Sequence, residues 1–182
     1  MGAPIIHWGP HADRTKVSQY SLDVLAELLI RAGIEEATIT STVRSPADDA
    51  RVVFDNLERP GGVAAARGLY KAPMQQVINV YVDAKRAGAS SDEIKARMTA
   101  TIIALGGRNC SHHILTDEEL KEINVLDVDV APEKKKAFRD VCAAESPAPQ
   151  GTNPNGLLAK ILVPPQDPCD HIEIRQQPTG AV

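Results

Sequence analysis

Aromatic residues are scarce in this sequence. They make up 3% of the chain, whereas hydrophobic residues as a whole reach 43%, which is ordinary for a globular protein. Leucine, isoleucine, valine and alanine must therefore build most of the core. The 182 residues are enough for one domain of ordinary size with a buried interior.

A basic excess and long apolar runs are also missing. The net charge is −4, and no basic stripe interleaved with aromatic residues is present, so we expect no nucleic-acid binding. No run approaches the roughly 18–20 apolar residues that cross a bilayer, so we expect no stable membrane insertion. The first residues lack a basic segment followed by an apolar one, so we expect synthesis in the cytoplasm without a signal peptide.

Cysteine is too rare for a disulfide framework. The chain has Cys110, Cys142 and Cys169, so at most one pair can form and one thiol is left over. This number favours a reducing compartment. Cys110 and Cys169 each lie close in sequence to a candidate metal-binding histidine, and the sequence leaves open whether they pair.

Helical and strand patterns alternate irregularly, without the repeated βαβ order of a parallel sheet. Apolar spacing and capping residues predict helices, and β-branched or alternating segments predict strands. The predicted helices span 18–33, 45–57, 72–88, 90–107 and 132–146, and the predicted strands span 36–43, 124–130, 157–163 and 170–175. We therefore expect an α+β fold, with a small antiparallel sheet flanked by helices.

The expected organisation is a single domain over residues 1–182 with a helical insertion at about 60–107. Two consecutive helices in that segment predict a helical hairpin, which could serve as a partner or dimer surface. Residues 146–156 are rich in Pro, Gly, Asn and Ser, a composition that predicts a flexible loop.

Histidines and acids lie in or beside short apolar strands. His171 lies in "DPCDHIEI", Asp127 and Asp129 lie in "NVLDVD", and His112 and His113 lie in "CSHHIL". Two histidines and one carboxylate suit zinc and leave one position for water, although each residue alone is more often an ordinary buried group. Neighbouring histidines on a strand face opposite ways, so only one should bind, whereas both aspartates face the same way.

Three segments, in order, resemble the zinc D-alanyl-D-alanine carboxypeptidases and endolysin peptidases that share a fold with the Hedgehog signalling domain. "ITSTVRSPADDAR" is similar to the strand, Arg-Ser and helix element of that family. "SHH…NVLDV" resembles its Ser-x-His…Ala-Val-Asp element, and "DPCDHIEI" resembles its closing acid-Pro…His element. Together they cover about 40 of the 182 residues.

The resemblance implies a zinc site formed by His113, Asp127 and His171. It also implies that Arg44 and Ser111 bind substrate. The activity expected from it is hydrolysis of amide bonds in the peptide stems of bacterial peptidoglycan by metal-activated water. Without the resemblance, Arg44 would be interpreted as a residue beside the helix start that forms an ion pair with Asp48.

The resemblance further implies a general base shortly before the last histidine. Asp167 is favoured because it precedes proline, as in the family, and Asp170 is the alternative. Glu173 lies two residues past His171 and therefore faces the same side of the sheet, where it could support the site or pair with Arg175.

The spacing from His113 to Asp127 is longer than in the family, because "ILTDEELKEI" intervenes. In that segment Thr116 and Glu119 predict a capping box and one short helical turn. Action on the cell wall would require delivery by a phage lysis or injection system. An alternative function is a non-catalytic binding or adaptor module on the same fold.

Overall fold

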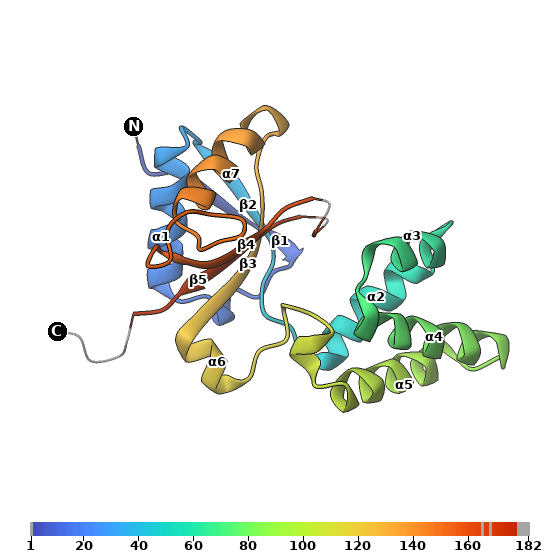
Figure 1. Cartoon of the computed structure of the whole chain (residues 1–182). Coiled ribbons are helices and arrows are strands. Elements are labelled where there is room, and N and C mark those ends of the chain that lie inside the picture. The colour runs from blue at the N-terminus through green and yellow to red at the C-terminus, as the bar shows by residue number, and fades with distance from the viewer. Residues whose placement is uncertain (1, 165, 168, 178–182) are drawn as a thin grey trace. The chain divides into compact units, whose positions relative to one another are not determined.

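The computed structural model describes residues 2–164, 166–167 and 169–177 (Figure 1). Its fold is α+β, as predicted, with helices flanking a five-stranded sheet. The chain divides into two compact units, which we describe separately. The sheet unit comprises Met1–Val43 and Thr116–Val182, and the helical unit comprises Arg44–Leu115. The helical unit thus starts earlier and ends later than the insertion expected at 60–107.

The sheet has the strand order β1-β2-β3-β5-β4. Its strands are β1 (Ile5–His11), β2 (Glu36–Ser41), β3 (Ile123–Asp129), β4 (Leu158–Leu162) and β5 (Asp170–Arg175). β1 and β2 are parallel, whereas the other three pairs are antiparallel, so the sheet is mixed rather than purely antiparallel. The four predicted strands are confirmed.

β1 was not predicted from the sequence, because Gly9 and Pro10 are residues typical of turns. The strand lies at the sheet edge, and its pairing with β2 shifts register between Trp8 and His11. Proline removes a backbone donor and is tolerated at an edge or an irregularity of this kind.

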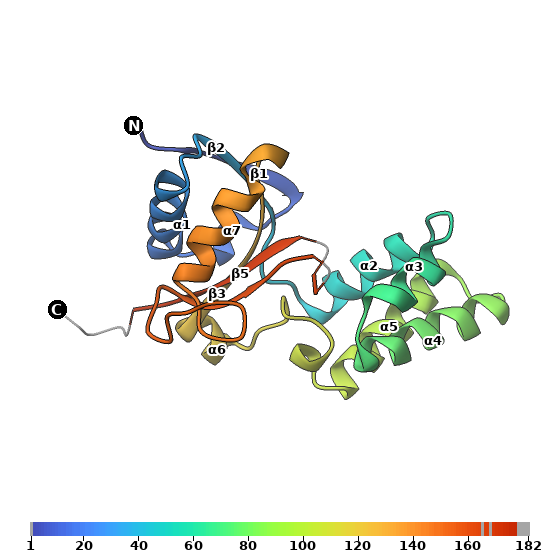
Figure 2. The same cartoon turned by 45° about the horizontal axis from the view of Figure 1, so that its top comes forward.

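One face of the sheet is covered by α1 (Gln19–Arg31) and α7 (Lys135–Ala144), which lie on the same side in both views (Figures 1 and 2). Their apolar residues recur at helical spacing and are fully buried against the strands. This core includes Leu25, Leu28, Leu29, Phe138, Leu126, Ile172 and Ile174. The predicted helix at 132–146 is realised as the 3-10 turn η3 (Pro132–Lys134) followed by α7.

The capping box predicted at Thr116 and Glu119 is confirmed and starts α6 (Asp117–Glu122), which leads directly into β3. Residues 146–156 contain neither helix nor strand. Backbone hydrogen bonds nevertheless tie this segment to the end of α7, including one from the Thr152 N–H to the Ala143 carbonyl at 3.2 Å. Gly156 packs so closely that a Cβ atom there would lie 2.2 Å from the Glu145 carbonyl oxygen.

The helical unit contains α2 (Pro46–Leu57), α3 (Gly62–Leu69), α4 (Ala72–Arg86), α5 (Ser91–Ala104) and the 3-10 turn η2 (Gly107–Asn109). α4 and α5 form the predicted hairpin, and the capping box of Ser90 and Glu93 is confirmed. Its separate core is largely aliphatic and includes Val53, Phe54, Leu57, Val77, Ile78, Met98 and Ile102. No helix within the described residues combines the length and apolar content that a membrane crossing requires.

Candidate metal centre

Asp127 and His171 are direct cross-strand partners on β3 and β5. The Nδ1 atom of His171 lies 3.0 Å from Oδ1 of Asp127, and both side chains are buried. Successive strand residues face opposite sides, so Leu126 and Val128 enter the apolar core while Asp127 points to the other face. Strand pairing thus brings together two of the three residues predicted to bind metal.

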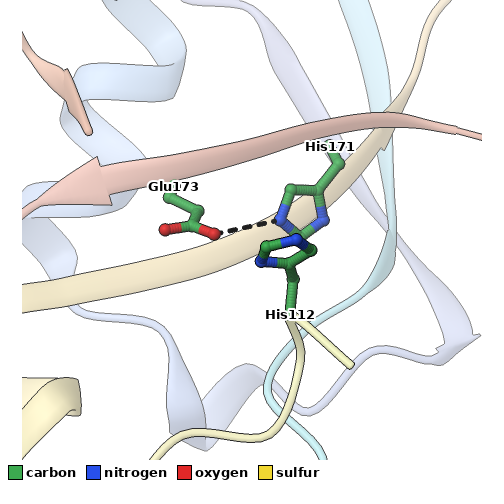
Figure 3. A group of neighbouring side chains, drawn as sticks. All are labelled: His112, His171 and Glu173. Carbon is green, nitrogen blue, oxygen red and sulfur yellow. Dashed lines mark ion pairs between the residues drawn. The ribbon is translucent and has the colours of Figure 1, made fainter. Parts of the chain in front are cut away.

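Glu173 extends this group along β5. It lies two residues beyond His171 on the same face, and its Oε1 atom is 3.6 Å from Nε2 of His171 (Figure 3). Across the sheet, Glu173 is the partner of Lys160 on β4, whose Nζ atom lies 3.9 Å from the carboxylate. A line of ionisable groups therefore crosses β3, β5 and β4.

The two carboxylates change the protonation of His171. Burial by itself lowers the pKa of an imidazole, but the carboxylates of Asp127 and then Glu173, with a further contribution from the charge of Asp167, raise the pKa of His171 to about 9. In the metal-free protein, His171 is therefore protonated at neutral pH. A metal ion bound here would take the place of that positive charge.

The donor set agrees with a metal site. Ligand atoms at zinc distances and tetrahedral angles lie about 3.3 Å apart, close to the 3.0 Å between the His171 nitrogen and the Asp127 oxygen. Buried histidine and carboxylate groups of this kind could hold a metal ion. Imidazole and carboxylate ligands suit zinc as well as several other divalent metals.

The structure separates Asp127 from its alternative, Asp129. Both belong to the same face of β3, but the side chain of Asp129 is 60% exposed and forms an ion pair with Lys135 at 3.0 Å. Burial therefore distinguishes two residues that alternation alone leaves equivalent.

The two candidates for the general base lie in different surroundings. Asp170 is buried on the side of the sheet opposite to His171, where its carboxylate lies 2.7 Å from Nε of Arg139 on α7. Asp167 precedes β5, is partly buried, and accepts a hydrogen bond from the Cys169 N–H at 3.1 Å. Pro168, which belongs to the motif that favoured Asp167, lies outside the described residues.

In the helical unit, Arg44 pairs with Asp49, a residue that the sequence reasoning missed. Asp49 is 2% exposed, and its Oδ1 atom lies 3.2 Å from the Arg44 guanidinium and accepts a hydrogen bond from the Ser111 hydroxyl at 3.0 Å. Asp48 instead accepts a hydrogen bond from Ser45. The sequence could have indicated that Asp49 is buried, because it lies four residues before Val53 and therefore on the same face of the helix.

Asp49 also fixes the segment that carries the two adjacent histidines. The Ser111 hydroxyl accepts a hydrogen bond from the His113 N–H at 3.3 Å, and the His113 carbonyl accepts one from the Arg44 N–H at 2.8 Å. His112 and His113 thus belong to the helical unit, whereas Asp127 and His171 belong to the sheet unit. Asp49 therefore contacts Arg44 and Ser111 directly, and it is connected to His113 through the Ser111 hydroxyl.

The cysteines do not supply a disulfide. Cys110, Cys142 and Cys169, all within the described residues, are present as thiols. Burial, followed by the charge of Asp49, raises the pKa of the Cys110 thiol, which makes it a weak nucleophile at neutral pH.

The chain was compared with protein-family models, curated proteins and solved structures, and nothing matches it. The family resemblance carried by the three sequence segments therefore remains a prediction.

Proposed function

We propose that this protein is a zinc-dependent peptidase that hydrolyses amide bonds in peptidoglycan stem peptides. The observation that carries the proposal is the buried pair of Asp127 and His171, held opposite one another on neighbouring antiparallel strands. An aspartate and a histidine in the positions that the resemblance assigns to zinc ligands are also adjacent in space. His113 is proposed as the third protein ligand.

Zinc, when bound, would polarise the substrate carbonyl and lower the pKa of a water molecule. Asp167 is the proposed base that accepts the proton of that water and passes it to the leaving amine. Asp167 is partly buried and lies four residues before His171, where the chain leads into β5. Asp170 is a poorer candidate because it is committed to Arg139 on the opposite face of the sheet.

Arg44 is the proposed substrate-binding residue, together with Ser111. A guanidinium can form two parallel hydrogen bonds to a carboxylate and can offset negative charge that develops on a tetrahedral intermediate. Asp49 holds one terminal nitrogen of Arg44, which restricts the guanidinium to a few orientations. Access to peptidoglycan would depend on delivery by a phage lysis or injection system.

The first test is the metal content of the purified protein and of His171→Ala after incubation with zinc and removal of excess metal. We expect one zinc per wild-type chain and loss of that zinc in the variant. Parallel measurements on His112→Ala and His113→Ala identify the third ligand, and Asp129→Asn is the matched control for Asp127→Asn. Absence of bound zinc from the wild-type protein would contradict the proposed function.

Turnover is tested next, by digesting purified peptidoglycan and analysing the released peptides by mass spectrometry. We expect cleaved stem peptides with the wild-type protein and none with Asp167→Asn at unchanged zinc content. Zinc binding without cleavage by the wild-type protein would instead favour the non-catalytic binding module.

A further inference from the structure

His171 has a carboxylate beside each of its two ring nitrogens. Oδ1 of Asp127 lies 3.0 Å from Nδ1. On the other side of the ring, Oε1 of Glu173 lies 3.6 Å from Nε2 (Figure 3). All three side chains are buried, and His171 is completely inaccessible to solvent. The ring therefore lies between two acids, within hydrogen-bond distance of Asp127 and within ion-pair distance of Glu173.

The two acids cannot have the same role if His171 binds metal. A metal-bound imidazole uses one nitrogen as ligand and donates the N–H of the other to a carboxylate or carbonyl, which fixes the ring and its tautomer. Asp127 is itself a proposed ligand and lies beside Nδ1, so Nδ1 is the nitrogen on the metal side. This leaves the N–H of Nε2 directed toward Glu173.

Burial of the Glu173 carboxylate costs free energy, which a role in orienting His171 would explain. A buried carboxylate loses hydration and is retained only where cations or donors compensate for that loss. Glu173 is 4% exposed, and Lys160 on the neighbouring strand lies 3.9 Å from its carboxylate. The ammonium group of Lys160 partly compensates this burial, and the carboxylate oxygens of Glu173 are acceptors for an imidazole N–H.

We infer that Glu173 is a positioning residue that orients His171, so that Nε2–H is held by Glu173 and Nδ1 is presented to the metal. This inference rests on the proposed zinc site and adds to it the tautomer of one ligand and the residue that selects it. Glu173 is not itself a ligand in this arrangement.

The direct test is the tautomer of His171 in the zinc-loaded wild-type protein, measured from the ¹⁵N chemical shifts of its imidazole. We expect a proton on Nε2 and metal on Nδ1. Metal on Nε2 would overturn the inference, and this measurement needs no variant that might fail to fold.

The second test is zinc affinity, measured by competition with a chelator, in Glu173→Gln and in Asp129→Asn. We expect zinc to bind Glu173→Gln about 10–100-fold more weakly, the usual cost of losing a residue that supports a ligand. Asp129→Asn should match the wild type, because this acid of β3 is exposed and paired with Lys135. Glu173→Asp should recover part of the loss.

Cobalt substitution separates positioning from direct binding. If Glu173 only positions His171, the visible absorption bands of the cobalt-loaded Glu173→Gln protein should keep their wild-type intensity. A change in coordination number, or a Glu173→Gln affinity equal to that of the wild type, would overturn this inference while leaving the zinc site intact. Absence of zinc from the wild type would overturn the proposed function as well.

Discussion

The two units differ in what they bury. Among the described residues, nine of the eleven buried polar or charged side chains belong to the sheet unit, and two, Asp49 and His113, belong to the helical unit. The helical core is built from aliphatic side chains at regular spacing. An unpaired buried polar group is costly, so each of these side chains needs a partner, and the sheet unit buries more of them. Of the proposed functional residues, Asp127 and His171 belong to the sheet unit, whereas Arg44, Ser111 and His113 belong to the helical unit.

Not every buried polar residue of the sheet unit has a chemical role. Asn124 accepts hydrogen bonds from the Ser18 N–H at 2.8 Å and from the Ser21 hydroxyl at 3.0 Å. These neutral contacts join the start of α1 to β3. The group of Asp127, His171 and Glu173 differs because its members are ionisable and face away from the apolar core.

The largest expected effect comes from the helical core. Ile78→Ala should lower the free energy of unfolding by about 2–5 kcal/mol, because it leaves a cavity at a fully buried position. Urea denaturation measures the loss. Ile103→Ala on α5 is the control, since that side chain is 60% exposed and should change stability little. Equal losses for the two variants would contradict the assignment of this core.

Metal should stabilise the sheet unit through its buried acids and histidine. Zinc present at 100 times its dissociation constant should raise the free energy of unfolding by about 2.7 kcal/mol, because it binds the folded state. His171→Ala should lose this response while Ile78→Ala retains it. Thermal unfolding with and without zinc measures the difference, and stabilisation of His171→Ala by zinc would place the metal elsewhere.

Asp49 provides a test of the few polar contacts in the helical unit. Asp49→Ala should lower the free energy of unfolding by about 1–3 kcal/mol, because it removes a partner of the mostly buried Arg44. Asp55→Ala, also on α2, removes only an exposed ion pair with Arg51 and should cost less than about 1 kcal/mol. Chemical denaturation compares them, and similar losses would show that burial of Asp49 has little energetic consequence.

The pH dependence of stability should differ between the metal-free and zinc-bound proteins. The pKa of His171 is raised to about 9 from an ordinary 6.5, so the folded state binds its proton more tightly. The resulting stabilisation is complete below pH 6.5 and is lost as the pH rises through about 9. Zinc binding should instead weaken at low pH, because its ligands must be deprotonated.

Melting temperatures at pH 6 and pH 9.5 test this expectation. The metal-free wild type should lose more stability than metal-free His171→Ala between the two values. An identical change in both proteins would show that His171 does not carry the effect.

Much of the secondary structure could be predicted because its determinants are local. Ser90 with Glu93 and Thr116 with Glu119 satisfy the first backbone donors of their helices through residues three positions apart. Alternation likewise placed Asp127 and His171 on strands. β1 escaped prediction because its pairing with β2, rather than its own residues, makes it a strand.

The sequence by itself determined most of the helices, most of the strands and which acids share a strand face, because backbone geometry repeats over a few residues. The helix α3 and the strand β1 were not among the predicted elements. Tertiary structure alone decided that Asp127 lies opposite His171, that Asp170 pairs with Arg139 and that Arg44 pairs with Asp49. Periodicity shows which face of an element a side chain occupies. It does not show which strand lies alongside, in what register the two strands pair, or which charged residue a buried side chain contacts.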